Sequence, residues 1–213
     1  MAKKIQSFLQ RKNSILETVS YGFMAKNTKV EMQEYTKVLV EQKGKTVGGW
    51  SRDYGVSTTK NFTELAPNAK PLLFLGYNNI TVHYLNTNYF SINRKYEGKT
   101  AGGGTAYYSG KITFRITEVD VNKFAKWAKD NKFKKNGDVW LNVAQAQNLI
   151  GNLFLEKGFE SVLSRKTLAS GHRIVPRTAT PLRTNDDDIL QEVVDFVNSN
   201  VERWGMRISI SFS

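Results

Sequence analysis

The triplet Gly-Lys-Thr is the pattern in this chain that comes nearest to a nucleotide-binding motif, and it occurs twice. It stands at 44–46 and again at 98–100. A phosphate-binding P-loop also needs a glycine five residues before the glycine of the triplet, because backbone N–H groups must wrap the phosphates. Those two positions hold Leu39 and Asn93. The sequence therefore predicts no nucleotide site at either triplet.

Side chains that bind metals or act as nucleophiles are scarce. The chain has two histidines, His83 and His172, and no cysteine, which excludes disulfides, thiolate nucleophiles and cysteine-based metal sites. Neither histidine has a second histidine at short spacing, and no Gly-x-Ser-x-Gly motif marks a catalytic serine. A Ser-His-Asp site would have to use one of these two histidines. We therefore expect no catalytic residue, no metal, no cofactor and no enzyme activity.

The acidic run 186–188 resembles a cation site at first sight. It stands at the start of a strongly predicted helix, where Asn185 or Asp186 can act as the cap. Carboxylates in a first helical turn are stabilised by the helix dipole. We therefore interpret the run as a helix start.

The chain is strongly basic, with 31 lysines and arginines against 19 acidic residues and a formal net charge of +12. Such a charge attracts nucleic acid, anionic membrane surfaces or an acidic protein. Basic residues are dense over 157–183, where Glu160 is the single acid. Arginine favours paired hydrogen bonds to phosphate or carboxylate, and a solvated loop is the alternative. The predicted interface or anion contacts are Lys45, Lys99, Arg165, Lys166, Arg173, Arg177 and Arg183.

The elements that must position these residues follow from hydrophobic spacing. Apolar residues at helical intervals predict an N-terminal helix over 3–19. Residues 28–43 favour a strand, with a helix as the alternative, and 72–75 favours a short strand before a turn at 76–79. Apolar and polar residues alternate over 80–84 and 112–116, which predicts strands with one buried face.

The second half of the chain is predicted to be mainly helical. One helix covers 141–156 with Gly158 as its stop, and another runs from Asn185 to Gly205. Residues 206–212 alternate again and predict a final strand that joins a sheet. We predict an α+β fold with a largely antiparallel sheet, helices packed on one face and extended glycine-containing loops.

The segments 44–49 and 98–103 are alike, and both contain glycines that suit tight turns. They are either mobile hairpin tips or flexible arms that become ordered against a partner. We predict one domain over 1–213, with loop arms near 44–55, 97–110 and 164–184.

Two resemblances bear on function. Residues 111–213 have the order strand, helix, helix, helix, strand and end in Trp204-Gly205-Met206-Arg207-Ile208. This half resembles the scaffold domain of the stomatin and prohibitin family, which implies membrane-associated rings. The whole chain is similar in character to the small structural proteins of tailed-phage particles, such as neck and tail components, which implies ring assembly.

The favoured hypothesis is a non-enzymatic structural protein, a ring or particle subunit such as a phage neck or tail component. Its partners would be copies of itself and other structural proteins. A nucleic-acid-binding protein that uses the basic loop is one alternative, and a stomatin- or prohibitin-like scaffold is another. The longest apolar run is far shorter than the roughly 20 residues of a spanning helix, and no signal peptide is recognisable. We expect no membrane span, no secretion by a signal peptide, and a location in a virion or the cytoplasm.

Overall fold

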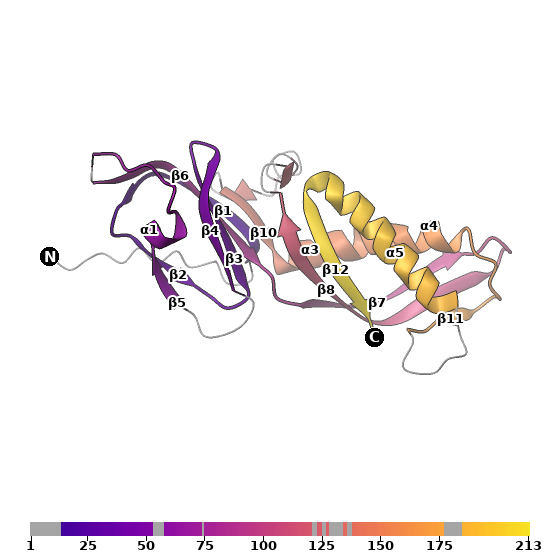
Figure 1. Cartoon of the computed structure of the whole chain (residues 1–213). Coiled ribbons are helices and arrows are strands. Elements are labelled where there is room, and N and C mark those ends of the chain that lie inside the picture. Colours follow the sequence, from indigo (N-terminus) through magenta and orange to yellow (C-terminus); the bar gives the residue numbers. More distant parts are fainter. Residues whose placement is uncertain are drawn as a thin grey trace. The chain divides into compact units, whose positions relative to one another are not determined.

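The computed structural model describes residues 14–52, 58–73, 75–120, 123–124, 127, 134–135, 138–176 and 185–213. Contacts divide the chain into two compact units, which are described separately (Figure 1). Unit 1 comprises Met1–Asn88 and Ala125–Asn142, and unit 2 comprises Tyr89–Phe124 and Val143–Ser213. The single domain over 1–213 stays a prediction, because a compact unit is defined by contacts and a domain by independent folding.

Unit 1 is built on a six-stranded antiparallel sheet with the order β4-β3-β6-β1-β10-β9. Its strands are β1 (Ser14–Ala25), β3 (Thr36–Gln42), β4 (Lys45–Arg52), β6 (Gly76–Asn86), β9 (Lys134–Lys135) and β10 (Asp138–Asn142). A two-stranded sheet pairs β2 (Lys29–Met32) with β5 (Thr58–Asn61), and the short helix α1 (Phe62–Leu65) follows. The predicted strand over 28–43 is thus two strands, and the helical alternative is wrong.

The core of unit 1 lies on one face of the six-stranded sheet. Alternate residues of β6, Ile80 and Val82, are buried there with Val40 of β3. The ring of Phe62 from α1 packs 4.9 Å from the ring of Tyr77. Because side chains alternate across a strand, the alternation over 80–84 predicted this buried face, and the strand there is confirmed.

Unit 2 is built around the long strand β8 (Thr105–Val119). The antiparallel strand β7 (Phe90–Lys99) pairs with one edge of β8. The other edge pairs with antiparallel β12 (Met206–Phe212) and, further along, with the short parallel strand β11 (His172–Ile174). The predicted strands at 112–116 and 206–212 are confirmed.

Helices cover one face of this second sheet. They are α3 (Val143–Asn148), the π-helical stretch η1 (Leu149–Leu155), α4 (Glu156–Leu163), α5 (Asn185–Val201) and the 3-10 turn η2 (Glu202–Trp204). Tyr108 of β8 stacks on Phe159 of α4, and the α5 side chains Val193 and Val197 are buried. The predicted α+β class, with largely antiparallel sheets and helices on one face, is confirmed. No helix in the described part of the chain is long and apolar enough to cross a membrane.

The N-terminal helix predicted over 3–19 is wrong for residues 14–19, which belong to β1; residues 1–13 lie outside the described part. Four successive residues, Ser14–Glu17, are buried, so both faces of the strand are covered there. A short apolar run of that kind cannot be told from a helix by its periodicity.

The predicted loop arms are largely wrong. Most of 44–55 is β4, paired along β3, and most of 97–110 belongs to β7 and β8, which leaves 100–104 as the hairpin loop. In 164–184 the strand β11 interrupts the loop, and 177–184 lies outside the described residues. The glycines were interpreted as turn residues, but Gly48 lies within β4 and allows close packing. A Cβ at this position would lie 2.0 Å from the Leu65 carbonyl oxygen.

Two further boundaries differ from the prediction. Of the strand predicted over 72–75, the described residues 72, 73 and 75 do not form a strand, since Leu72 makes only an isolated bridge with Gly76; residue 74 lies outside the described residues. Residues 76–79 belong to β6 instead of a turn. Asn79 has φ +52, a left-handed conformation that asparagine tolerates. Gly158 does not stop a helix either; a Cβ there would lie 3.3 Å from Val193, so the glycine lets α4 and α5 approach closely.

Candidate functional site

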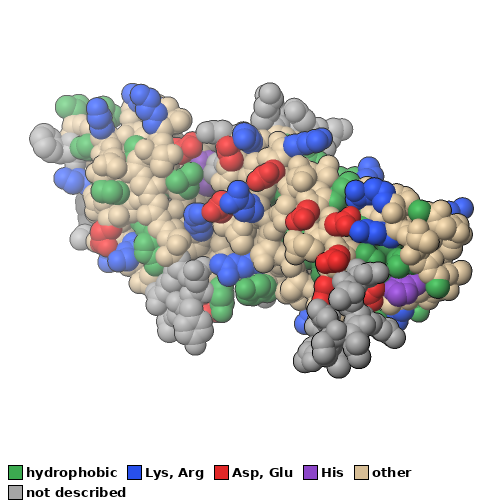
Figure 2. Space-filling view, turned by 45° about the vertical axis from the view of Figure 1, so that its right-hand side comes forward, with side chains coloured by type: hydrophobic (Ala, Val, Ile, Leu, Met, Phe, Trp, Pro, Cys, Tyr) green, Lys and Arg blue, Asp and Glu red, His purple; other side chains and the backbone are tan. Residues whose placement is uncertain are grey.

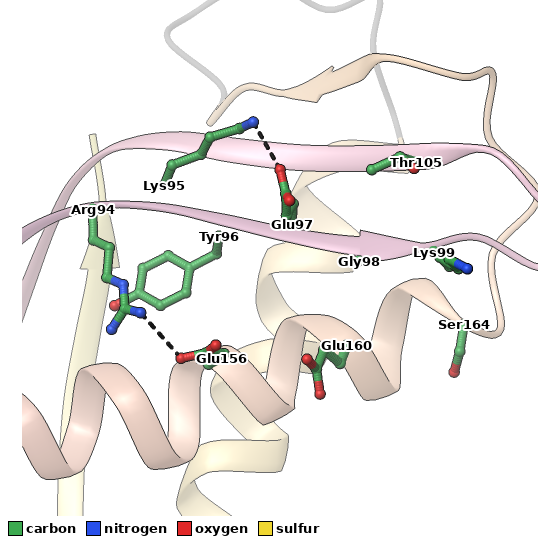
Figure 3. A pocket seen from close by; sticks show the side chains of 10 residues that line it. All are labelled: Arg94, Lys95, Tyr96, Glu97, Gly98, Lys99, Thr105, Glu156, Glu160 and Ser164. Carbon is green, nitrogen blue, oxygen red and sulfur yellow. Dashed lines mark ion pairs between the residues drawn. The ribbon is translucent and has the colours of Figure 1, made fainter.

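A groove of about 820 Å³ opens on unit 2 between β7 and α4 (Figure 3). Residues 94–99 of β7 form one wall. Glu156 and Glu160 of α4 line the other, and Ser164 continues their line just beyond the helix. Positions four apart share one face of a helix. The groove therefore has a strand edge on one side and a stripe of polar helix side chains on the other.

Hydrogen bonds of β8 show which residues of β7 face outward. Lys111 of β8 exchanges both backbone hydrogen bonds with Ser213, at 2.8 and 2.9 Å, beyond the end of β12. Alternate residues of an antiparallel strand bond to opposite neighbours, so the even-numbered residues of β8 bond toward β7. Tyr96 lies opposite Tyr108 in the register. The even-numbered residues of β7 therefore bond to β8, and the odd-numbered ones face away from it.

The outer edge of β7 presents backbone N–H and C=O groups at Asn93, Lys95 and Glu97. Ser91 fits this assignment, because its carbonyl accepts a hydrogen bond from the Gln147 side chain of α3 at 2.8 Å instead of bonding to β8. Within the residues that the structure describes, no strand pairs with this edge. A peptide strand laid along it would gain main-chain hydrogen bonds and direct alternate side chains toward α4.

Most charges beside this edge are already paired. Arg94 Nη2 lies 3.3 Å from Glu156 Oε2, and Lys95 Nζ lies 2.7 Å from Glu97 Oε2 (Figure 3). The hydrogen bond that Lys95 donates to the Glu97 carboxylate raises the pKa of Lys95. Glu160 forms no ion pair with any described residue. The groove therefore offers an incoming strand little net charge and a carboxylate at Glu160 that suits a basic side chain.

Stacked aromatic rings hold β7 against α4 beneath the groove. The Tyr96 ring lies 5.3 Å from the Phe159 ring at 13°, and Tyr108 stacks on the same Phe159 at 5.7 Å. Burial raises the pKa of Tyr96 to about 12. Its hydroxyl, which has no hydrogen-bond partner among the described residues, lies 3.2 Å from the place of a Cβ on Gly151. The phenol is therefore neutral near pH 7 and acts as packing.

The predicted basic contacts are distributed over several places. Lys99 lines the groove of unit 2, whereas Lys45 lines a separate groove of unit 1. Arg165 and Lys166 both form ion pairs with Glu192 of α5, so this one carboxylate offsets part of their combined charge within the fold.

Of the other three predicted contacts, the structure describes Arg173. Arg173 Nη2 lies 3.5 Å from the Ser109 carbonyl, at the outer limit of a hydrogen bond. Arg177 and Arg183 lie outside the described residues. Among the described members of the predicted set, Arg165 and Lys166 are therefore the two that share an ion-pair partner.

A hydroxyl, an imidazole and a carboxylate lie in a row within unit 1. Thr18 Oγ1 is 2.9 Å from His83 Nδ1, and His83 Nε2 is 3.5 Å from Glu41 Oε2. The second distance is a long ionic contact and not a hydrogen bond. His83 and Glu41 are 5% and 7% exposed, and Thr18 lies directly opposite His83 in the pairing of β1 with β6. We interpret the row as a cross-strand contact that stabilises the sheet.

His83 is expected to make unit 1 less stable in acid. Burial lowers the pKa of His83 from 6.5, and the nearby Glu41 opposes that shift only in part. The unfolded chain then takes up the proton first, so stability is full above the unfolded pKa and falls as the pH drops below about 6.5. The slope for one group is at most about 1.4 kcal/mol per pH unit. Urea unfolding at several pH values should show a smaller acid loss in His83→Gln than in the parent or in His172→Gln. An equal loss in all three proteins would contradict this assignment.

The second histidine has a structural partner. Asp186 Oδ1 lies 3.0 Å from His172 Nε2, and its Oδ2 accepts the Val175 N–H at 3.1 Å. Asp186 is 4% exposed. Asp187 and Asp188 remain in the first turn of α5. The predicted helix start is confirmed, but its first carboxylate also fastens the segment around β11 to the helix.

Sequence reasoning missed the acidic stripe of the groove. Glu156 and Glu160 are four residues apart, which would have marked a shared helix face. The predicted helix ended near 156, so the two residues were not placed on one element. No protein-family model matches this chain, and no curated protein is similar enough in sequence to be matched to it.

Proposed function

We propose that this chain is a non-enzymatic assembly protein, a subunit of a ring or particle such as a virion neck or tail component. The observation that carries the proposal is the outer edge of β7, which pairs with no strand in the described part of the chain and lies beside the groove of about 820 Å³. Exposed strand edges are templates for pairing with another chain, and folded proteins commonly cover or shorten them. Here the edge is long and is flanked by a helix that can contact a bound strand.

In this proposal, an extended segment of a second copy pairs with β7 at Asn93, Lys95 and Glu97. Its alternate side chains would lie against Glu156 and Glu160 of α4. The ion pairs at the edge do not repel such a segment, because each joins two residues of the same subunit. When the pairing segment comes from a different part of the neighbour, the contact is head-to-tail, and it closes into a ring if the rotation between successive subunits closes.

Sedimentation over a range of protein concentrations tests the proposal. The parent should gain mass as its concentration rises, and Lys95→Pro should stay at the mass of one subunit. Proline removes an outward N–H and adds bulk at an edge, while the hydrogen bonds of β7 to β8 remain. Lys95→Ala is the matched control, because it deletes the ion pair and keeps the N–H; it should still assemble.

Circular dichroism must show the same folded signal for all three proteins. A parent that has the mass of one subunit at every concentration would contradict self-assembly. If Lys95→Pro assembles as the parent does, the edge of β7 is not the interface. Only the general proposal, that the chain is an assembly protein, would then stand.

The two alternatives remain hypotheses. Nucleic-acid binding through the basic loop has less support, because Arg165 and Lys166 pair with Glu192. Binding through phosphate contacts would weaken steeply with added salt. The stomatin- or prohibitin-like scaffold is compatible with the final helix and strand of unit 2, α5 and β12, but rests on the order of elements alone.

A further inference from the structure

A turn of unit 1 carries large apolar side chains that face solvent. Leu73 is 77% exposed, Leu75 72% and Leu72 47%. The turn is closed by backbone hydrogen bonds from Leu72 N–H to Gly76 at 2.7 Å and from Leu75 N–H to Leu72 at 3.1 Å. Lys26 N–H donates to the Leu75 carbonyl at 3.2 Å, which fastens the turn to the end of β1. The exposed leucines are therefore held in place by the sheet.

Phe23 of β1 extends this apolar surface. It is 54% exposed, and its Cζ atom would lie 2.7 Å from a Cβ on Gly76, at the base of the turn. We call Phe23, Leu72, Leu73 and Leu75 the apolar tip. Contiguous apolar groups on a surface mark sites of contact with another protein or a membrane.

The backbone of the tip gives a second indication. Leu73 has φ +46, in the left-handed region where bulky residues are rarely found. A leucine that is mostly exposed gains little from the core in return for this strained conformation. Strain of this kind is concentrated at functional positions, so the leucine is better explained by a contact outside the chain.

Exposed lysines surround the tip. Gln42 joins the β3–β4 turn to the segment before the tip, since its side chain accepts from Lys70 N–H at 2.8 Å and donates to the Lys70 carbonyl at 2.9 Å. Lys43, Lys45 and Lys70 line a groove of about 500 Å³ next to Leu72, and none of its lining residues is acidic. Lys26 lies beside the tip as well, since its N–H bonds to the Leu75 carbonyl of the turn. We call these lysines the collar: Lys26, Lys43, Lys45 and Lys70.

The lysines of the collar are available to bind anions of another molecule. None of its lysines forms an ion pair with a residue in the described part of the chain. Figure 2 shows hydrophobic and basic side chains together at the upper left, over the end of unit 1 where Figure 1 draws the loop that leads into β6. Apolar groups at a projecting turn, with cations around them, are arranged as at a membrane interface.

We propose that the apolar tip and the collar dock unit 1 onto an anionic lipid surface. The leucines and Phe23 would enter the boundary between head groups and acyl chains, and the lysines would contact lipid phosphates and carboxylates. Binding of this kind grows with the apolar area that enters the membrane and with the attraction of basic residues to anionic lipids, and this end of unit 1 supplies both. The inference does not depend on the edge of β7 or on assembly.

Flotation of the full chain with vesicles tests the proposal. Equimolar phosphatidylcholine and phosphatidylserine vesicles should bind it, and vesicles of phosphatidylcholine alone should bind it at least about tenfold more weakly. The triple variant Lys43→Gln/Lys45→Gln/Lys70→Gln should lose about tenfold or more in affinity for the anionic vesicles. The control Lys111→Gln/Lys157→Gln changes exposed lysines of unit 2 and should bind nearly as the parent does.

The variant Leu73→Gly tests the membrane contact of the apolar tip without destabilising the fold. Glycine adopts φ +46 without strain, so this variant should be at least as stable as the parent while its vesicle affinity falls by about tenfold or more. Because the chain has no cysteine, a polarity-sensitive dye can be attached at Leu73→Cys, with Val175→Cys of unit 2 as the control site. The dye at 73 should report an apolar environment with anionic vesicles, and the dye at 175 should not.

The results of these experiments distinguish a membrane from other binding partners of the apolar tip. Absence of binding to anionic vesicles, or equal binding by the parent and Leu73→Gly, would overturn the proposal. A fall in the sedimenting mass of the vesicle-free protein on Leu73→Gly, without vesicle binding by the parent, would identify a second copy of the chain as the occupant instead.

Discussion

Replacing Gly48 by alanine is expected to lower the free energy of unfolding by about 3 kcal/mol. A Cβ at this position of β4 would lie 2.0 Å from the Leu65 carbonyl oxygen and 2.7 Å from the Ala66 Cα atom. Both are backbone atoms, so no side-chain rotation can relieve the overlap, and the segment after α1 must move away from the sheet. Urea unfolding of the parent and the variant measures the loss.

Gly22→Ala is the matched control for that experiment. Gly22 also lies in a strand of unit 1, but a Cβ there meets no atom within 4 Å. Alanine should therefore leave stability unchanged or raise it by about 0.5 kcal/mol, since glycine costs more conformational entropy in a strand. Equal losses in the two variants would show that Gly48 is not a packing glycine.

Replacing Asp186 by alanine is expected to cost about 2 kcal/mol of stability in unit 2. The substitution removes the buried acceptor of the Val175 N–H and the partner of His172, and it leaves both groups without their protein partner. Asp186→Asn keeps one acceptor oxygen and should lose less. Thermal unfolding of the variants measures these differences.

The neighbouring acid shows whether the effect is specific. Asp188 is an exposed residue in the same first turn of α5, so Asp188→Ala should lose only the dipole contribution, about 0.5 kcal/mol. A loss in Asp188→Ala as large as in Asp186→Ala would mean that the first-turn charge matters and the tether to β11 does not.

Strands were predicted well where alternate side chains point toward the core, because this arrangement gives the sequence an apolar pattern of period two. The alternation at 80–84 and at 206–212 corresponds to β6 and β12. The final helix also followed its pattern, with acids in the first turn and Gly205 at φ +78 after its last turn. The residues within each of these elements determine its structure, so the sequence of the element was enough to predict it.

Other elements depend on contacts far along the chain. β1 has both faces covered at Ser14–Glu17, so its sequence carries no alternation there. Gly48 and Gly158 look like loop or stop signals, yet each allows a close approach by a distant segment. The partner in each case is fixed by the fold, and glycine alone does not reveal it.

The candidate sites were predicted only in part. Lys45 of β4 and Lys99 of β7 each line a groove, and their contact with an anion or a partner stays a prediction. The charge of Arg165 and Lys166 suggested an anion contact, but Glu192 of α5, which offsets part of that charge, is more than twenty residues away in sequence. The apolar run at 72–75 predicted a short strand, whereas the side chains of Leu72, Leu73 and Leu75 are exposed to solvent. Hydrophobicity predicts burial only on average.

Hydrogen exchange at β7, measured as a function of protein concentration, tests the central claim of assembly through this edge most directly. The N–H groups of Asn93, Lys95 and Glu97 face away from β8 and should exchange rapidly in dilute protein. They should become protected as the concentration rises, while the N–H groups of Tyr96 and Gly98, already bonded to β8, change little. Protection that appears elsewhere as the mass grows, with these outward N–H groups still exchanging rapidly, would contradict the account.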